Sequence, residues 1–290
     1  MSRRSIRVCA IVAVVAIVGV GYGWIRFNRV AVGIPNFYVW KVVTGHRHNG
    51  HRAKVNGISI YYETYGHGRP VLLLHGATAF LETMHYFITG LAPEHFVIAV
   101  DSRAQGRSTD SDAPISYALM GDDMIKLLDT MHIPSTDVVG WSDGGIIGLD
   151  MAMKHPDRVR RLVAIGANYD VDGIDPKDFH LDPNAEATAS SKPFYERVAP
   201  DPSHFPIMYK KVMTMVATQP HYTIADLGQI RCPTLIVAGE HDMILSEHTA
   251  KLATAIPGAQ KIIVPGASHF GPLEQPDAYN SMVLKFLDAP

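Results

Sequence analysis

Six short apolar runs are spaced through the chain between residues 70 and 265. None shows the polar alternation of a strand with one exposed face, and continuous runs of this kind are typical of strands buried on both faces of a parallel sheet. The runs are Val71 to Leu74, Val97 to Val100, Val138 to Gly140, Leu162 to Ile165, Leu235 to Gly239 and Ile262 to Val264. They predict a central sheet that is mostly parallel.

Amphipathic helical patterns lie between these runs. Within residues 116–131, apolar side chains recur at spacings of three and four residues, which is the pattern of a helix with one buried face. A second helix is expected from Ser142 to about His155, and a third is expected to begin at Ser246. This alternation of strands and helices predicts a doubly wound α/β fold, in which helices cover both faces of the sheet.

Two segments depart from the alternation. Asn56 and Gly57 precede an alternating apolar pattern, and this combination predicts an antiparallel hairpin at the start of the sheet. Residues 170–228 are rich in Pro, Asp and Ser, and a structureless loop of that length would be unusual in a compact domain. We therefore predict a helical lid there, inserted over the carboxyl edge of a core formed by residues 54–169 and 229–290.

The N-terminal 30 residues form a segment of another kind. Arginines at positions 3, 4 and 7 precede an uncharged stretch of 18 residues from Val8 to Ile25. As a helix this stretch would be about 27 Å long, enough to cross a bilayer, and the same pattern fits a signal peptide. Residues 1–30 are therefore predicted to anchor or export the protein, with its body outside the cytoplasm. Residues 31–53 are predicted to form a basic linker, whose aromatic residues between Ile34 and Lys41 suit a membrane interface.

Charge narrows the class of partner. Residues 1–62 carry nine of the 26 Lys and Arg residues and none of the 28 Asp and Glu residues, so the remainder has a formal charge of −11. An acidic body argues against a nucleic-acid partner. The histidines at positions 46, 48 and 51 are expected to be solvated rather than to bind a metal, because no carboxylate or cysteine joins them.

The stretch "VVGWSDGG" (Val138 to Gly145) sets one serine among three glycines. Residues 140–144 match G-x-S-x-G between a predicted strand and a predicted helix. In such a sharp turn the central residue is strained, and the flanking glycines avoid collisions. The Ser142 hydroxyl would then stand at a helix N-terminus, where the helix dipole and free N–H groups favour developing negative charge. The pattern predicts a nucleophilic serine.

Together with its neighbours, this motif makes residues 54–288 resemble the α/β-hydrolase superfamily. The motifs are "LLLHG" (Leu72 to Gly76), "DSRAQGRS" (Asp101 to Ser108), "GWSDGG" (Gly140 to Gly145), "GEHD" (Gly239 to Asp242) and "GASHF" (Gly266 to Phe270). Ala104 stands where the second motif usually has glycine. "GWSDGG" and "ANY" (Ala167 to Tyr169) are most similar to the small-cap esterases of the valacyclovir-hydrolase type. The resemblance implies an α/β-hydrolase fold and serine hydrolase chemistry, with no cofactor and no metal.

A serine nucleophile requires a base within hydrogen-bond reach, and the base requires a carboxylate to orient it. Ser142, Asp242 and His269 occur in the order that this architecture uses. Asp242 and His269 follow the last two apolar runs, so both would reach the sheet edge where Ser142 lies. Glu240 and Asp170 are the alternative acids, and Asp242 is preferred because it lies immediately beyond a strand end.

Further residues are assigned by the resemblance. It implies that the backbone N–H groups of Ala77 and Asp143 form the oxyanion hole. In the related branch the acidic residue after the nucleophile recognises a substrate amino group, and Asp143 matches that position. His75 is expected with Asp143 as a substrate-binding residue. The alternatives are that Asp143 only stabilises the first turn of its helix, and that His75 is structural. Five aromatic residues of the lid would line an acyl site or form the lid's own core: Phe179, Phe194, Tyr195, Phe205 and Tyr209.

The expected function is hydrolysis of small-molecule carboxylic esters, with amides and aminoacyl esters as further candidates, through an acyl-enzyme intermediate. A carbon–carbon bond hydrolase or a perhydrolase on the same triad is the alternative within the fold. A non-catalytic, membrane-tethered interaction protein on a hydrolase scaffold is the alternative of another class. Dehalogenases and epoxide hydrolases are disfavoured, because their nucleophile is a carboxylate where this chain has Ser142.

Overall fold

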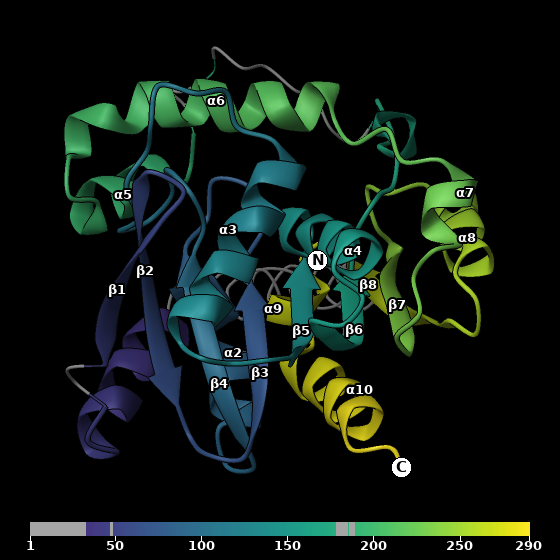
Figure 1. The fold of residues 1–290 in the computed structure, drawn as a ribbon, viewed down its shortest axis with the longest axis horizontal. Helices are drawn as coiled ribbons and strands as arrows, with labels where there is room; N and C mark the ends of the chain where they lie inside the picture. The colour runs from purple at the N-terminus through teal and green to yellow at the C-terminus, as the bar shows by residue number, and fades with distance from the viewer. Residues whose placement is uncertain (1–32, 47–48, 178–184, 186–188) are drawn as a thin grey trace, which may run out of the picture.

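One eight-stranded sheet organises the protein in the computed structural model, which describes residues 33–46, 49–177, 185 and 189–290 (Figure 1). The predicted signal or anchor segment 1–30, including the apolar stretch 8–25, lies outside the described residues. The strand order is β1-β2-β4-β3-β5-β6-β7-β8. The strands are β1 (Gly50–Val55), β2 (Ile58–Tyr65), β3 (Arg69–Leu74), β4 (His95–Asp101), β5 (Thr136–Trp141), β6 (Val159–Ile165), β7 (Thr234–His241) and β8 (Gln260–Ser268).

The pairing of the strands confirms the predicted fold class. β1 and β2 form the expected antiparallel hairpin, and β2 runs antiparallel to β4. All remaining neighbours, from β4 through β3 to β8, are parallel. Because parallel strands end on the same side, the loops after β3, β5, β7 and β8 meet at one carboxyl edge.

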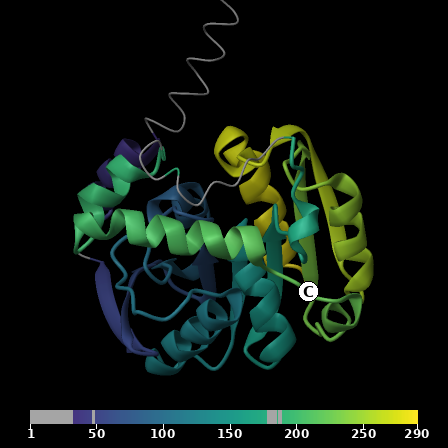
Figure 2. The ribbon, with the colours of Figure 1, turned by 90° about the horizontal axis from the view of Figure 1, so that it is seen from above.

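Helices cover both faces of the sheet, as Figures 1 and 2 show. α3, α4 and α8 pack on one face, whereas α2, α10 and a helix over residues 33–43 pack on the other. Successive strand residues supply the two layers alternately: Leu72 and Leu74 join one cluster, Val71 and Leu73 the other. Besides the helix over residues 33–43, the described helices outside the lid are α2 (His85–Leu91), α3 (Tyr117–Thr130), α4 (Asp143–Lys154), α8 (Ser246–Ala255), α9 (Gly271–Glu274) and α10 (Pro276–Leu287), with a short 3-10 helix η1 (Leu81–Met84).

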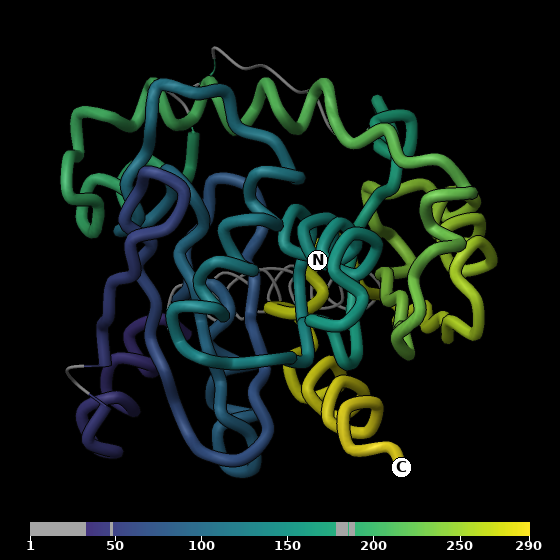
Figure 3. Tube along the Cα trace, viewed as in Figure 1, coloured from purple at the N-terminus to yellow at the C-terminus, as the bar shows by residue number. Residues whose placement is uncertain are grey.

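The described residues of the predicted lid segment 170–228 include the helices α5 (Lys192–Val198), α6 (Phe205–Thr218) and α7 (Ile224–Leu227). α6 crosses above the carboxyl edge, and Figure 3 follows the chain from the purple N-terminal segment at lower left to this green helix at the top. Two 3-10 turns, η2 (Val171–Gly173) and η4 (Pro202–His204), also lie in the segment.

The lid is tied to the core by charge and by aromatic contacts. Asp110 accepts hydrogen bonds from His204 Nε2 at 3.0 Å and from Lys211 Nζ at 2.8 Å. Of the predicted lid aromatics, Phe179 lies outside the described residues. Tyr195, Phe205 and Tyr209 pack on one another and into the core, while the half-exposed Phe194 ring lies 5.8 Å from that of Phe80.

The segment predicted as a basic linker, residues 31–53, is structured in large part. Its helix over residues 33–43 buries Phe37 against the sheet, and β1 begins at Gly50. Lys41 donates to both carboxylate oxygens of Glu63, at 2.8 and 2.6 Å, with both side chains almost fully buried. Burial acts to raise the pKa of Glu63, but hydrogen bonds from Lys41 and Tyr65 hold that pKa below its ordinary value.

None of the helices in the described part of the chain is both long enough and apolar enough to cross a membrane.

We predict that Lys41→Met lowers the free energy of unfolding by about 3–5 kcal/mol, because it leaves the Glu63 carboxylate buried without its cation. Lys251→Met is the matched control: its pair with Glu247 is exposed, so the loss should stay within about 1 kcal/mol. Urea unfolding of both variants measures the difference. Equal, small losses would show that helix 33–43 is not held by this ion pair.

Candidate active site

Ser142 occupies a strained turn between β5 and α4. Its backbone angles are φ 56° and ψ −121°, in a region that residues with a side chain rarely adopt. A conformation of this kind costs about 1–3 kcal/mol and persists only where the surrounding structure enforces it. Here the Ser142 N–H donates to the carbonyl of Ile165 on the neighbouring strand at 2.7 Å.

Two glycines make the turn sterically feasible. A Cβ atom on Gly140 would lie 2.1 Å from the carbonyl oxygen of Gly144. A Cβ atom on Gly144 would lie 2.1 Å from the carbonyl oxygen of Leu74 in β3. Any other residue at either position would push α4 away from the sheet, so the motif's glycines are explained by close backbone approach.

The structure brings Ser142, His269 and Asp242 together at the carboxyl edge. His269 Nε2 lies 3.0 Å from Ser142 Oγ, and His269 Nδ1 lies 2.7 Å from Asp242 Oδ1. With Nδ1–H donating to the carboxylate, Nε2 is free to accept the serine proton. The three residues come from the β5–α4 turn, the loop after β7 and the loop after β8, as their sequence order predicts.

Asp242 is the acid that faces the histidine. Its Oδ1 also accepts from the backbone N–H of Ile244 at 3.0 Å, and its Oδ2 accepts from that of Gly239 at 3.4 Å. The alternative acids point elsewhere: Glu240 accepts from the backbone of Gly266, and Asp170 pairs with His221 at 2.9 Å.

Contacts that sequence analysis did not assign fix the histidine loop. Trp141 Nε1 donates to the carbonyl oxygen of His269 at 2.9 Å. Glu274 accepts from both the backbone N–H and the hydroxyl of Ser268, each at 2.9 Å. These hydrogen bonds hold His269, which is only 8% exposed, against the turn that carries Ser142. The only sequence signal for Trp141 is its place beside Ser142.

The loop after β3 lies against the nucleophile. A Cβ on Gly76, the residue before Ala77, would be 3.1 Å from Ser142 Cβ and 3.7 Å from Ser142 Oγ. Asp143 is the first residue of α4, and the N–H groups of a first helical turn have no acceptor within the helix. Asp143 thus follows the nucleophile directly, and Ala77 follows a residue that contacts it, while their role as oxyanion donors stays a prediction.

His75 is placed differently from the substrate-binding role predicted for it. The residue is buried, its Nδ1 donates to the carbonyl of Gly76 at 2.8 Å, and its Nε2 accepts from the N–H of Ser102 at 3.0 Å. Burial lowers the pKa of His75 to about 4, so the ring is neutral. Because both ring nitrogens bind backbone, His75 joins the oxyanion loop to the loop after β4 and offers neither nitrogen to a substrate.

The loop after β4 supports the same region. Asp101 Oδ1 accepts from the N–H of Leu81 at 2.7 Å, while its Oδ2 accepts from the N–H of Arg107 at 2.8 Å. Burial raises the pKa of Asp101 to about 6, against the opposing effect of Arg107. Ala104, where the related motif usually has glycine, adopts the left-handed conformation with φ 65° and is fully buried.

Asp143 carries an unusual carboxyl group beside the triad. The residue is 3% exposed; Oδ1 accepts from the Tyr117 hydroxyl at 2.9 Å, and Oδ2 has no hydrogen-bond partner among the described residues. Burial raises its pKa to about 7, although the Tyr117 bond and His269 act in the opposite direction. A buried carboxylate oxygen without a donor favours a cationic or hydrogen-bonding ligand.

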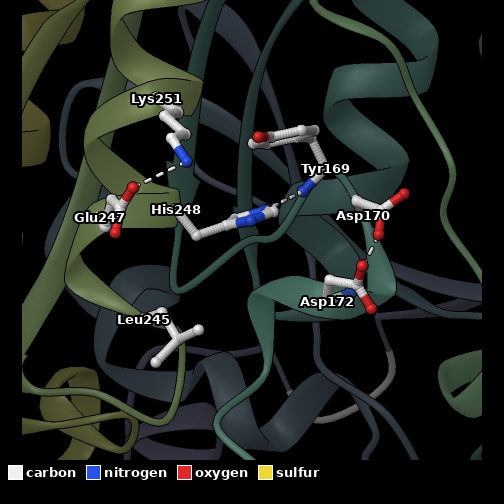
Figure 4. Close-up of a pocket in the computed structure, with 7 residues that line it drawn as sticks. All are labelled: Tyr169, Asp170, Asp172, Leu245, Glu247, His248 and Lys251. Carbon is white, nitrogen blue, oxygen red and sulfur yellow. Dashed lines mark hydrogen bonds and ion pairs between the residues drawn. The ribbon is translucent and has the colours of Figure 1, made fainter.

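A separate pocket of about 280 Å³ is lined by residues that follow β6, such as Tyr169, and by residues of α8, such as His248 (Figure 4). Its wall includes His248, whose ring stacks on that of Tyr169 and accepts from the Tyr169 N–H at 3.0 Å. Beside it, the start of the lid pairs with the acid loop through the bridge between Ile174 and Ile244. The lid is thus connected to the loop that carries Asp242.

No group of His, Cys, Asp or Glu side chains within the described ranges is arranged to hold a metal ion. Of the linker histidines, His46 stacks on Trp40 and His51 on Tyr62. His48 lies outside the described residues.

Comparison with known proteins agrees with this architecture. The chain is 30% identical over 252 residues to a protein named putative carbamate hydrolase RutD from Azorhizobium caulinodans, an alignment that covers 78% of this chain and 94% of the relative. It is 27% identical over 256 residues to serine hydrolase BPHL of Mus musculus, covering 81% and 85% respectively.

Solved structures show the same fold. An enol-lactonase from Burkholderia xenovorans LB400 superposes with a TM-score of 0.69 at 22% identity, over 82% of this chain and all of the other. A hydrolase from Pseudomonas aeruginosa superposes with a TM-score of 0.68 at 24% identity, over 83% and 99%. Residues 71–282 match the alpha/beta hydrolase family, and the chain is therefore a hydrolase that belongs to that family.

Proposed function

We propose that the protein is a serine hydrolase that cleaves carboxylic esters through an acyl-enzyme. Ser142 Oγ attacks the ester carbonyl carbon while His269 Nε2 takes the hydroxyl proton, and Asp242 stabilises the imidazolium. The backbone N–H groups of Ala77 and Asp143 stabilise the carbonyl oxygen as it becomes negative.

Collapse of this tetrahedral intermediate breaks the bond to the alcohol, which leaves with the proton from His269. Water then attacks the acyl-enzyme, with His269 again as base, and releases the acid and free Ser142. Each proton removed by His269 is returned, so no metal or redox group is needed in the scheme.

The hydrogen-bonded series from Asp242 through His269 to Ser142 is the observation that supports this proposal most strongly. The strained φ of Ser142 supports it too, because strain of this kind is found mainly at functional positions. A purely structural scaffold would gain stability by relaxing that turn.

A second candidate concerns the substrate. We propose that aminoacyl esters are preferred, with the Asp143 carboxylate binding the substrate's ammonium group. The partnerless Oδ2 of Asp143 favours this candidate, because burying such an oxygen without a ligand is costly. Tyr117 holds the other oxygen and so fixes the carboxyl plane.

We also propose a location. The apolar stretch 8–25 would anchor the protein in a membrane with its body outside the cytoplasm, and a cleaved export signal is the alternative. The absence of charge in this stretch and the arginines that precede it support the proposal.

We expect Ser142→Ala to lower kcat for p-nitrophenyl esters by a factor on the order of 10⁶, since loss of a triad serine has that effect. A fluorophosphonate probe should label the wild type at Ser142 and leave Ser142→Ala unlabelled. Ser246→Ala, at the exposed start of α8, is the matched control and should retain both labelling and turnover.

The same assay separates the alternatives. Labelling of Ser142 without turnover of any ester would favour a carbon–carbon bond hydrolase or a perhydrolase. Absence of both labelling and turnover in the wild type would refute the serine hydrolase and leave the non-catalytic protein.

We expect Asp143→Asn to reduce kcat/KM for alanine benzyl ester by about 10–100-fold, as for loss of a charged hydrogen bond. The backbone donor at this position is unchanged, so kcat/KM for benzyl propionate should stay within about threefold. Because the Asp143 pKa is about 7, its carboxyl is protonated at lower pH, and the wild-type preference for the amino ester should increase between about pH 5.5 and 7.5.

The ratio of kcat/KM for the two substrates cancels any effect of pH that both substrates share. Asp170→Asn is the control and should keep the wild-type ratio at each pH. The contrary result is an amino ester that is no better a substrate than benzyl propionate at any pH, in the wild type and in Asp143→Asn alike. That result would mean that Asp143 only stabilises the first turn of α4.

A further inference from the structure

An apolar face that none of the described residues covers lies on the outer side of the helix over residues 33–43. Tyr38, Val39, Val42 and Val43 are 42%, 61%, 57% and 78% exposed, and we call these four residues the valine face. Positions separated by four residues lie on the same side of a helix, so the four side chains form one continuous strip. Contiguous exposed apolar surface of this kind marks an interaction site.

The helix is firmly attached by its other side. Phe37 is 2% exposed, Lys41 forms its buried pair with Glu63, and Trp40 stacks on Phe37 with ring centroids 5.6 Å apart. The Tyr38 hydroxyl donates to Glu82 of η1 at 2.8 Å, although its ring remains part of the exposed strip. The valine face is therefore exposed on a fixed helix, with a defined orientation relative to the active site.

The orientation differs from the one expected for the aromatic residues of this segment. Sequence analysis assigned the aromatic residues between Ile34 and Lys41 to a membrane interface, but Phe37 packs inward, and three valines and one tyrosine face outward. Any contact with an apolar partner is thus made mainly by aliphatic side chains.

The preceding chain indicates which partner this is. Only seven residues separate Ile25, the last of the uncharged stretch, from Gly33 at the start of the helix. Seven extended residues reach at most about 25 Å, so a bilayer that holds residues 8–25 must lie close to the helix. Five basic residues besides the paired Lys41 follow the apolar stretch within residues 26–62, and no acidic residue does: Arg26, Arg29, Arg47, Arg52 and Lys54. This excess of positive charge on the side of the helix favours an anionic lipid surface.

A second copy of the chain fits the strip less well. Stable protein interfaces bury about 800 Å² on each partner and use some 20–30 residues, whereas this strip offers four side chains. A helix that lies in the plane of a bilayer needs only one apolar strip.

We propose that the valine face rests on the surface of a phospholipid bilayer, so that helix 33–43 is an interfacial helix that orients the hydrolase body on the membrane. The inference rests on the membrane anchor proposed above. It goes further, because an anchor alone would leave the body free to rotate above the surface.

Site-specific fluorescence in the full chain tests the proposal. Val42→Cys, in a chain with Cys9→Ser and Cys232→Ser, is labelled with the polarity-sensitive fluorophore NBD. The protein is reconstituted into vesicles of phosphatidylcholine and phosphatidylglycerol with or without spin-labelled lipid. Ile224→Cys on α7 is the matched control, because Ile224 is 52% exposed and α7 lies on the other side of the molecule (Figures 1 and 2).

The label at position 42 should emit at shorter wavelength than the label at 224 and should be quenched several-fold more by spin-labelled lipid. Adding Val39→Asp and Val43→Asp, both at exposed positions, should remove this difference while the protein stays on the vesicles. An NBD group at 42 that is as water-exposed as at 224, on protein that floats with the vesicles, would overturn the lipid contact while leaving the anchor intact.

Two further outcomes count against the proposal and have different meanings. A blue-shifted emission without quenching by spin-labelled lipid would mean that protein, either a second copy or residues 8–25, covers the valine face. Failure of the chain to float with vesicles would refute the anchor itself, and with it the interfacial helix.

Discussion

The positive φ of Ser142 is the constraint on which the rest of the site depends. A strand that continued straight into α4 would direct this side chain into the sheet or along it, far from any base. The turn instead projects the hydroxyl at the carboxyl edge, and it can form only because β5, α4 and β3 approach so closely that Gly140 and Gly144 cannot carry a Cβ. The cost of the strain, about 1–3 kcal/mol, is offset by the packing of α4 on the buried strand β5.

With the hydroxyl fixed, the parallel sheet supplies its partners. The loops after β7 and β8 lie at the same edge as the end of β5, and each is held by hydrogen bonds outside the triad. Asp242 accepts hydrogen bonds from two backbone N–H groups, and the indole N–H of Trp141 donates to the carbonyl oxygen of His269. The loop after β3 is fixed by the neutral ring of His75. The reacting groups are therefore positioned before a substrate arrives, which is what electrostatic stabilisation of a transition state requires.

Local patterns were sufficient to predict the sheet and the position of the nucleophile. Uninterrupted apolar runs such as Val71 to Leu74 are fully buried strands, and G-x-S-x-G between a strand and a helix has one compatible backbone geometry. Long-range pairs could not be predicted in this way. The bond between Lys41 and Glu63 fixes one side of a helix on the sheet where the sequence indicated a basic linker. The bond between Tyr117 and Asp143 spans 26 residues and leaves no local signal. The role of His75 could not be predicted for the same reason, because its Nε2 accepts a hydrogen bond from Ser102, which lies after another strand.

The central claim is that the strained turn presents Ser142 to His269 and to the two backbone donors at once. A crystal structure of the protein after reaction with an alkyl phosphonate tests this most directly, because the tetrahedral phosphorus resembles the intermediate. The account predicts phosphorus bonded to Ser142 Oγ, with the phosphonyl oxygen about 3 Å from the backbone nitrogens of both Ala77 and Asp143. An adduct on another side chain, or a phosphonyl oxygen directed away from both nitrogens, would contradict it.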